Sequence, residues 1–355
     1  MPEPAVKPKD PSNRYANELD HSVNAAGVCW MLLLMAALVF GVNAYAIAKS
    51  PASERTYDGM IVAKKWDLAS AGIAADGIAI IGDSSGNFAV STDVLEEELG
   101  VQARNYCTYG RFQVTGSAWF LDQAIEASGS APSLVIVVTG SRTFLLDPTG
   151  FEFAQVPIGV TEMGSRVPGV GLGVLRTLQF AAARALPLFA QHRSFERSLL
   201  NGAWQIRADV LPVGPGGTTR LPRAYPDGVG PFAAAMLKEM AAVEGPVPSL
   251  REQEAIQALV RDAEERGYDL VFVDGPIWDG LVDSPEHMAF LGKIHASIDA
   301  ACADSERAIR LDVPLQAFPA TELENPFHIV PAASARFSKE LARQLLDRSL
   351  PRGPR

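Results

Sequence analysis

The chain has 355 residues, of which 48% are hydrophobic and 20% charged, enough for one large domain or one domain with a small addition. Its formal net charge of −10 argues against a nucleic-acid-binding protein, which needs a basic face. Three cysteines are too few for a disulfide framework, and no Cys-x-x-Cys pair or cysteine–histidine cluster predicts a metal site. Cys107 and Cys302 either form one disulfide or are two buried thiols, and we favour the thiols.

The N-terminal part of the chain reads as a tail followed by a membrane segment. Residues 1–25 are polar and contain several prolines, a composition typical of a flexible tail. Residues 26–48 are apolar or small apart from Asn43, and about 20 such residues span a bilayer. Small-residue triplets within 44–48 resemble signal-peptide cleavage sites, but the preceding region is long and carries acids. We therefore expect an uncleaved signal anchor.

Basic residues flank the apolar segment on both sides, so they do not determine its orientation. A single N-terminal span ahead of a large domain usually places that domain outside the cytoplasm. We therefore expect a single-pass inner-membrane protein whose main domain is periplasmic.

Residues 49–76 are interpreted as a linker with some helical character, and residues 77–349 as the main domain. Apolar runs predict strands at Ile78–Ile81, Val101–Tyr106, Leu134–Thr139, Leu270–Val273 and Ile309–Val313. Stretches with helical periodicity occur at Phe88–Leu99, Ala118–Ala127, Ser249–Arg266, Glu286–Ala303 and Ala332–Ser349. This alternation predicts an α/β fold with a mostly parallel sheet covered by helices on both faces.

The alternation breaks between about residues 147 and 245, which we interpret as an insertion that partly covers the site. Val174–Phe189 and Ser194–Ile206 have helical character. Val213–Thr219 and Pro222–Gly230 are rich in glycine and proline and predict loops.

A candidate nucleophile follows the first strand of the domain. The apolar run Ile78–Ile81 ends in Gly82-Asp83-Ser84, and a helical segment comes next. A serine on such a turn has an exposed hydroxyl and lies near the free N–H groups of a helix start, as a nucleophile and its oxyanion require. The alternative is an ordinary turn in which Asp83 or Ser84 caps the helix.

A candidate base lies late in the chain, at His328, in the segment Glu324-Asn325-Pro326-Phe327-His328 just before the last helix. In a doubly wound sheet that helix would pack beside the first strand. Ser84 and His328 would then meet at the carboxyl edge of the sheet, and we expect them within hydrogen-bonding reach. The other histidines precede the span, lie in the insertion or share one helix on which packing roles are commoner (His21, His192, His287, His295).

Four elements of this sequence, in order, resemble the conserved blocks of the SGNH (GDSL-like) hydrolase superfamily. They are Gly82-Asp83-Ser84, Gly110 after the second strand, Gly140 after the third, and a histidine before the last helix. The layout is most similar to the membrane-anchored polysaccharide acyltransferases, including alginate O-acetyltransferase-like and D-alanyl-transfer proteins. The resemblance covers about residues 77–348 and implies a three-layer α/β/α sandwich following one N-terminal transmembrane helix.

The resemblance also implies serine-dependent acyl transfer without a cofactor or metal. Ser84 would attack an acyl carbonyl and His328 would take its proton. The expected site comprises catalytic residues and residues for the oxyanion or the substrate: Ser84, His328, Asn325 and Asp83 in the first group, and Gly110, Gly140, Ser141 and Arg142 in the second. The expected partners are a polysaccharide or acyl-donor substrate, the membrane and a membrane-bound O-acyltransferase. The covering insertion and the anchor favour transfer over hydrolysis, because excluding water favours transfer.

Two residues depart from the pattern of the superfamily. Its last block is Asp-x-x-His, but Asn325 stands in the acid position, so either Glu324 replaces the acid or a Ser–His dyad acts alone. Its third block is Gly-x-Asn, but Arg142 stands in place of the asparagine and would donate to the oxyanion or bind an anionic substrate. These departures leave a second hypothesis open, in which a catalytically degenerate domain binds glycan or serves a membrane acyltransferase as a partner subunit.

Overall fold

A computed structural model describes residues 25–49, 57–146, 153–156, 158, 173–186, 213–221 and 223–350. The chain forms two compact units, Met1–Lys49 and Ser50–Arg355, which are described separately. The predicted tail, apart from Ala25, and the predicted helix Ser194–Ile206 lie outside the described residues.

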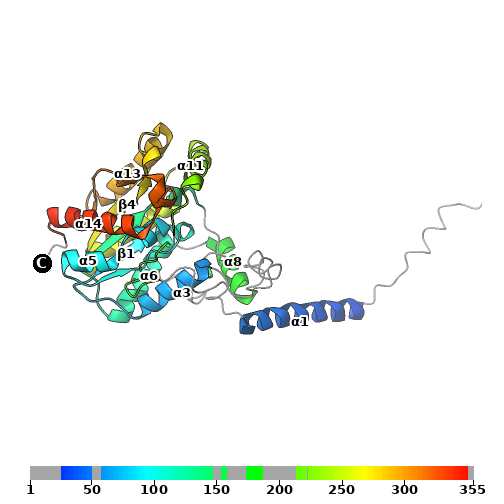
Figure 1. Ribbon diagram of the computed structural model, residues 1–355. Coiled ribbons are helices and arrows are strands. Elements are labelled where there is room, and N and C mark those ends of the chain that lie inside the picture. Colours follow the sequence, from blue (N-terminus) through cyan, green and yellow to red (C-terminus); the bar gives the residue numbers. More distant parts are fainter. Residues whose placement is uncertain are drawn as a thin grey trace, which may run out of the picture. The chain divides into compact units, whose positions relative to one another are not determined.

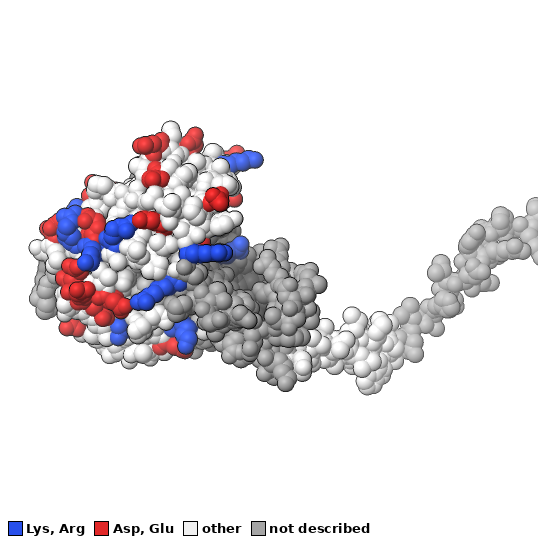
Figure 2. Space-filling model, in the orientation of Figure 1, with Lys and Arg blue, Asp and Glu red and all other residues white. Residues whose placement is uncertain are grey.

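The first unit contains one long apolar helix, α1 (Ala25–Lys49). Its segment Ala26–Tyr45 is long and apolar enough to cross a membrane, and its described side chains are uncharged (Figure 2). The side-chain amide of Asn43 donates a hydrogen bond to the carbonyl oxygen of Val39 at 2.8 Å, one turn earlier. This bond pairs one polar group of the amide within the apolar segment. The predicted apolar helix is therefore confirmed, and its crossing of a membrane stays a prediction.

The second unit is built on a sheet of five parallel strands in the order β2-β1-β3-β4-β6. Their bounds are Ile78–Gly82 for β1, Ala103–Asn105 for β2, Leu134–Thr139 for β3, Asp269–Asp274 for β4 and Ala308–Arg310 for β6. Two short ladders lie outside this sheet, formed by β5 (Ile277–Trp278) with β7 (Ala317–Phe318) and by β8 (Leu323–Asn325) with β9 (His328–Ile329). The predicted α/β class with a mostly parallel sheet is confirmed.

The side chains of β1 and β3 point alternately to two hydrophobic clusters, one on each face of the sheet. Ala79, Ile81 and Val137 contribute to one cluster, whereas Ile80 and Val138 contribute to the other. The first face is covered by α3 (Tyr57–Ser70), α6 (Gln113–Ser128), α12 (Leu250–Arg266) and α13 (Pro285–Cys302). The second is covered by α4 (Ser84–Ala89), α5 (Thr92–Leu99) and α14 (Pro331–Asp347), so that helices enclose the sheet on both faces (Figure 1).

The stretch Phe88–Leu99, predicted as one helix, is two. The α4 helix begins at Ser84 and ends at Ala89, Val90 and Ser91 are extended, and α5 follows. The Asn105 amide from β2 donates to the carbonyl oxygens of Gly86 and Val90, both at 3.0 Å. These bonds satisfy carbonyl groups at the break, and the separate α4 keeps Ser84 on the first turn of its own helix.

Two further segments are more ordered than the sequence predicts. Pro222–Gly230 is not only loop, because α11 (Pro226–Ala241) begins within it, with proline at the first helical position where no N–H is needed. The expected linker contains α3, whose Ile61, Val62 and Lys65 are buried. The second compact unit therefore includes α3, which precedes the predicted start of the domain at Gly77.

The remaining described elements are short or lie within the insertion. They are the 3-10 helices η2 (Gly110–Phe112), η3 (Ser141–Leu145), η4 (Asp279–Leu281) and η5 (Ala320–Glu322), and the helix α8 (Gly173–Ala185). Helix α8 matches the first part of the predicted helix Val174–Phe189. Cys107 is a buried thiol and Cys302 a partly buried one, and they are not joined in a disulfide.

Candidate active site

The turn from β1 into α4 positions Ser84. Gly82 has a φ of +138°, and a Cβ atom there would lie 1.9 Å from the carbonyl oxygen of Val138, so only glycine fits. Asp83 is the N-cap of α4 and Ser84 is the first helical residue. The expected cap and the expected nucleophile position therefore coexist on one turn.

The carboxylate of Asp83 is buried and binds four donors. It accepts the backbone N–H groups of Ser85 and Gly140, each at 2.7 Å, and the hydroxyls of Ser85 and Thr143. None of these partners is His328. Asp83 therefore does not take the part of a triad acid that orients the histidine, and its contacts instead lock the nucleophile turn onto the loop after β3.

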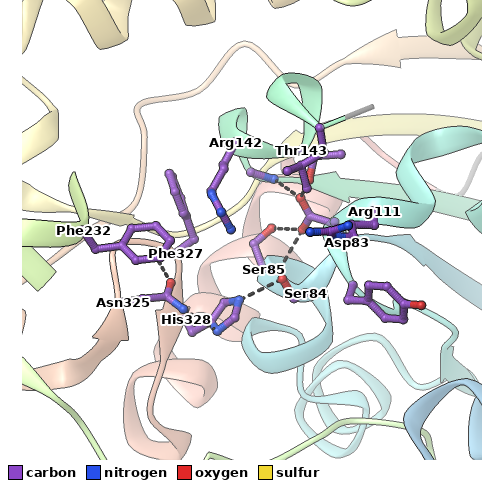
Figure 3. A pocket seen from close by; sticks show the side chains of 14 residues that line it. Asp83, Ser84, Ser85, Arg111, Arg142, Thr143, Phe232, Asn325, Phe327 and His328 are labelled. Carbon is purple, nitrogen blue, oxygen red and sulfur yellow. Dashed lines mark hydrogen bonds between the residues drawn. The ribbon is translucent and has the colours of Figure 1, made fainter. Parts of the chain in front are cut away.

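His328 reaches Ser84 from the other end of the chain. Its Nε2 atom lies 2.8 Å from the Ser84 Oγ atom, and its ring packs on Phe88 with centroids 4.6 Å apart. The β8–β9 ladder and a hydrogen bond from the Trp278 N–H to the Pro326 carbonyl oxygen, at 2.8 Å, hold the histidine loop. The expected proximity of Ser84 and His328 is confirmed (Figure 3).

The other ring nitrogen of His328 has two neighbours of opposite character. The Asn325 Nδ2 atom lies 2.7 Å from Nδ1, and the Glu324 Oε2 atom lies 3.1 Å from it. The Asn325 oxygen accepts the Phe327 N–H at 3.0 Å, which fixes the amide with its nitrogen toward the ring. An amide donor favours a bare Nδ1 and a proton on Nε2, whereas a carboxylate favours a proton on Nδ1 and a bare Nε2.

Only the second tautomer can take a proton from Ser84, because a base needs a free lone pair at Nε2. The two neighbours of Nδ1 therefore oppose one another. The carboxylate of Glu324 favours the form of His328 that can act as a base, and the amide of Asn325 favours the form that cannot.

Two backbone N–H groups beside Ser84 are suited to an oxyanion. Ser84 is the first residue of α4 and Gly110 the first of η2, so neither N–H has an acceptor within its own helix. The Gly140 N–H is bound to Asp83 instead. Ser141 differs from expectation, because its hydroxyl lies 2.9 Å from the Nε2 atom of His287 and not in the pocket of Ser84.

A pocket of about 280 Å³ surrounds the pair. Arg142 points into it, with its guanidinium carbon 4.8 Å from the ring centre of Phe232 (Figure 3). Arg111 lines the pocket as well. The remaining lining residues are Asp83, Ser84, Ser85, Tyr109, Gly110, Gly140, Thr143, Leu146, Asn325, Phe327 and His328.

Several of the residues that line this pocket were not predicted from the sequence. Phe232 lies on α11, and the sequence predicts a loop where that helix begins. No sequence pattern therefore indicates that Phe232 lines the site. Arg111 directly follows Gly110, so the motif that predicts Gly110 as a site residue could also have indicated Arg111.

Two histidines of α13, His287 and His295, are not among the lining residues of the pocket. Burial lowers the pKa of His287, and His295 contacts both carboxylate oxygens of Asp274 at 2.9 and 3.0 Å. Both histidines were expected to have surface or packing roles, and the burial of His287 fits a packing role. Within the described parts of the chain, no group of three or more histidine, cysteine or acidic side chains is placed to hold a metal ion.

Neither a scan against protein-family models nor a search of curated proteins finds a match to this chain.

Proposed function

We propose that the protein is a membrane-anchored acyl-transfer protein of the SGNH type, with Ser84 as nucleophile and its main domain outside the cytoplasm. The observation that carries the proposal is the 2.8 Å contact between Ser84 Oγ and His328 Nε2 at the carboxyl edge of a parallel sheet. The buried Asp83 network supports it, because it holds the nucleophile turn in one geometry.

The chemistry follows from these positions. The Ser84 oxygen attacks the acyl carbonyl carbon while its proton passes to Nε2 of His328. The carbonyl oxygen becomes an oxyanion that the N–H groups of Ser84 and Gly110 can bind. The intermediate then expels the leaving group, which takes the proton from Nε2. An acceptor hydroxyl then attacks the carbonyl carbon of the acyl-serine while its proton passes to Nε2, and Ser84 leaves and takes that proton back.

Glu324 takes the role of the missing acid in this proposal. Its carboxylate is the negatively charged group beside Nδ1, and it would hold the productive tautomer and stabilise the imidazolium. Because the side chain of Glu324 is 45% exposed, this support is weaker than that of a buried aspartate. We therefore expect modest turnover.

The pocket favours a substrate with a sugar-like or anionic portion. Arg111 and Arg142 bring guanidinium groups to a cavity that Phe232, Phe327 and Tyr109 line with aromatic rings. Guanidinium groups bind carboxylates and phosphates, so the pocket suits a substrate that carries anionic groups. The proposed acceptor is therefore a cell-envelope or secreted polysaccharide. Phe232 belongs to the insertion, and its place in the pocket wall favours transfer over hydrolysis, because a covered site excludes water.

Labelling with a fluorophosphonate probe tests the nucleophile. We expect the wild-type chain to be labelled and Ser84→Ala to lose labelling completely. Ser141→Ala is the matched control, because Ser141 forms the other serine–histidine contact of this site region yet lies outside the pocket. Labelling that survives Ser84→Ala and disappears in Ser141→Ala would show that Ser141, and not Ser84, is the nucleophile.

A non-catalytic role is the second candidate, and one observation favours it. The Asn325 amide faces Nδ1 of His328 at 2.7 Å, an arrangement that favours the unproductive tautomer. The domain would then bind glycan or serve as a partner subunit of a membrane acyltransferase. In that case the wild-type chain would not react with the probe, whereas Arg142→Ala would still weaken glycan binding.

Protease treatment of intact spheroplasts tests the proposed location. We expect digestion of the domain from outside while the N-terminal tail stays protected. A domain that is protected until the inner membrane is lysed would reverse the orientation.

A further inference from the structure

Helix α8 (Gly173–Ala185) packs on the domain through the side that carries Phe180. Phe180 is fully buried and Ala183 nearly so. The Arg184 guanidinium donates to the carbonyl oxygens of Val156 and Ile158 and lies 5.6 Å from the ring centre of Phe180. These contacts fix which side of the helix faces the domain.

The opposite side of α8 is apolar and exposed. Val174, Leu175 and Leu178 are 80%, 70% and 62% exposed. Val174 and Leu178 are one turn apart with Leu175 beside them, so the three side chains form one stripe away from Phe180. The other large apolar side chains exposed among the described residues of this unit are scattered singly (Tyr225, Leu250, Met288, Leu346), which needs no explanation.

The chain itself limits how far the start of the domain can be from a membrane. Helix α1 ends at Lys49 and α3 begins at Tyr57, so only the seven residues 50–56 separate the two helices. Fully extended, seven residues span about 25 Å. If α1 crosses a bilayer, this short connection keeps the start of α3 within that distance of the end of α1.

The charges of α8 suit a membrane surface. The helix contains no acidic residue, although the whole chain has a net charge of −10, and its Arg184 faces the domain. An apolar helix face without acidic charges is suited to the interfacial region of a bilayer, where anionic lipids would repel acidic side chains.

We propose that α8 lies on the surface of the membrane that α1 crosses, with Val174, Leu175 and Leu178 inserted among the lipid headgroups and upper acyl chains. The inference rests on the membrane-anchoring part of the proposed function and is independent of its chemistry.

The full chain in lipid vesicles provides the test. Leu178→Cys, in a chain that also carries Cys29→Ser and Cys302→Ser, is labelled with an environment-sensitive fluorophore. Cys107 is fully buried and remains. Leu250→Cys in the same background is the matched control, because Leu250 is an equally exposed leucine of the same unit, at 67%. The vesicles contain phosphatidylcholine and phosphatidylglycerol, with a nitroxide on the upper acyl chain as quencher.

We expect quenching at position 178 to be several-fold stronger than at position 250, with a blue-shifted emission. Equal, weak quenching at both positions would overturn the inference if a label on the native Cys29, within α1, is quenched in the same vesicles. An unquenched Cys29 label would overturn the anchoring itself and the inference with it, whereas fluorophosphonate labelling of Ser84 would be unaffected. The inference would also be overturned if the cysteine at position 178 were protected from labelling in native membranes but not in vesicles. A membrane protein would then cover α8.

Discussion

The two halves of the candidate site are built in opposite ways. On the serine half, the buried Asp83 carboxylate accepts hydrogen bonds from four donors. On the histidine half, two neighbours compete for one ring nitrogen of His328, and one of them, Glu324, is half exposed. The first half allows one arrangement, whereas the second is balanced between two tautomers.

The difference shows where activity is decided. A nucleophile turn held by a buried carboxylate with four donors can be lost only by breaking that network. A histidine balanced between a donor and a carboxylate can be shifted in either direction by one substitution. Changes on the serine half should therefore affect folding and activity together, and changes on the histidine half should affect activity alone.

The largest expected effect is on the serine half, from Asp83→Ala. The substitution leaves several buried donors without an acceptor and frees the turn that carries Ser84. We expect loss of probe labelling and a destabilisation of about 3 kcal/mol. Probe labelling and denaturant unfolding of the full chain in detergent measure the two effects.

Thr143→Val is the graded comparison, because it removes one donor of the four and should cost about 1 kcal/mol. Full activity in Asp83→Ala would show that the network does not position Ser84.

The next effect is on the histidine half, from Glu324→Gln. Removing the charge beside Nδ1 should lower turnover of a small ester by a factor of about 10² to 10⁴. Stability should hardly change, because exposed ion pairs contribute little. Glu322→Gln is the matched control, since Glu322 is two residues away and pairs with Arg336 instead. Equal losses in both variants would mean that Glu324 acts only through the structure of the loop.

A smaller effect of opposite sign is expected from Asn325→Asp. One oxygen of the new carboxylate can still accept the Phe327 N–H, and the other replaces the competing donor at Nδ1. With Glu324 present, we expect turnover to rise about tenfold, equivalent to about 1.4 kcal/mol.

The double variant Glu324→Gln with Asn325→Asp should recover much of the activity that Glu324→Gln loses. Failure of this rescue would show that position 325 does not act on His328 through its charge.

The sequence predicts the serine half better than the histidine half, for a physical reason. The apolar run before Gly82 and the cap at Asp83 act locally, so the turn and the place of Ser84 can be predicted from neighbouring residues. The end of α4 depends instead on the Asn105 amide from β2, and the direction of Ser141 depends on His287 of α13. The orientation of the Asn325 amide depends on a backbone N–H that no pattern specifies. Helix α11 was missed because its proline- and glycine-containing start is also typical of a turn.

The smallest expected effect concerns the polar network behind the serine helix. The Lys65 ammonium is fully buried and donates to the main-chain and side-chain oxygens of Asn105, at 2.7 and 3.2 Å, and to the Gly217 oxygen at 2.5 Å. Asn105 in turn holds the end of α4. Lys65 thus extends the serine half into the core, and burial lowers its pKa from 10.5 to about 7.

The sign of the pH dependence follows from this depressed pKa. Between about pH 7 and pH 10.5 the unfolded chain keeps a proton on Lys65 that the folded chain has released. Unfolding therefore takes up protons, and this residue makes stability rise with pH, by at most about 1.4 kcal/mol per pH unit. Below pH 7 both states are protonated and the contribution is constant. Lys65→Met should flatten the rise, whereas Lys64→Met, at an exposed position on the same helix, should leave it intact. Denaturant unfolding at several pH values across this window measures the slope, and equal slopes in both variants would mean that Lys65 does not titrate within it.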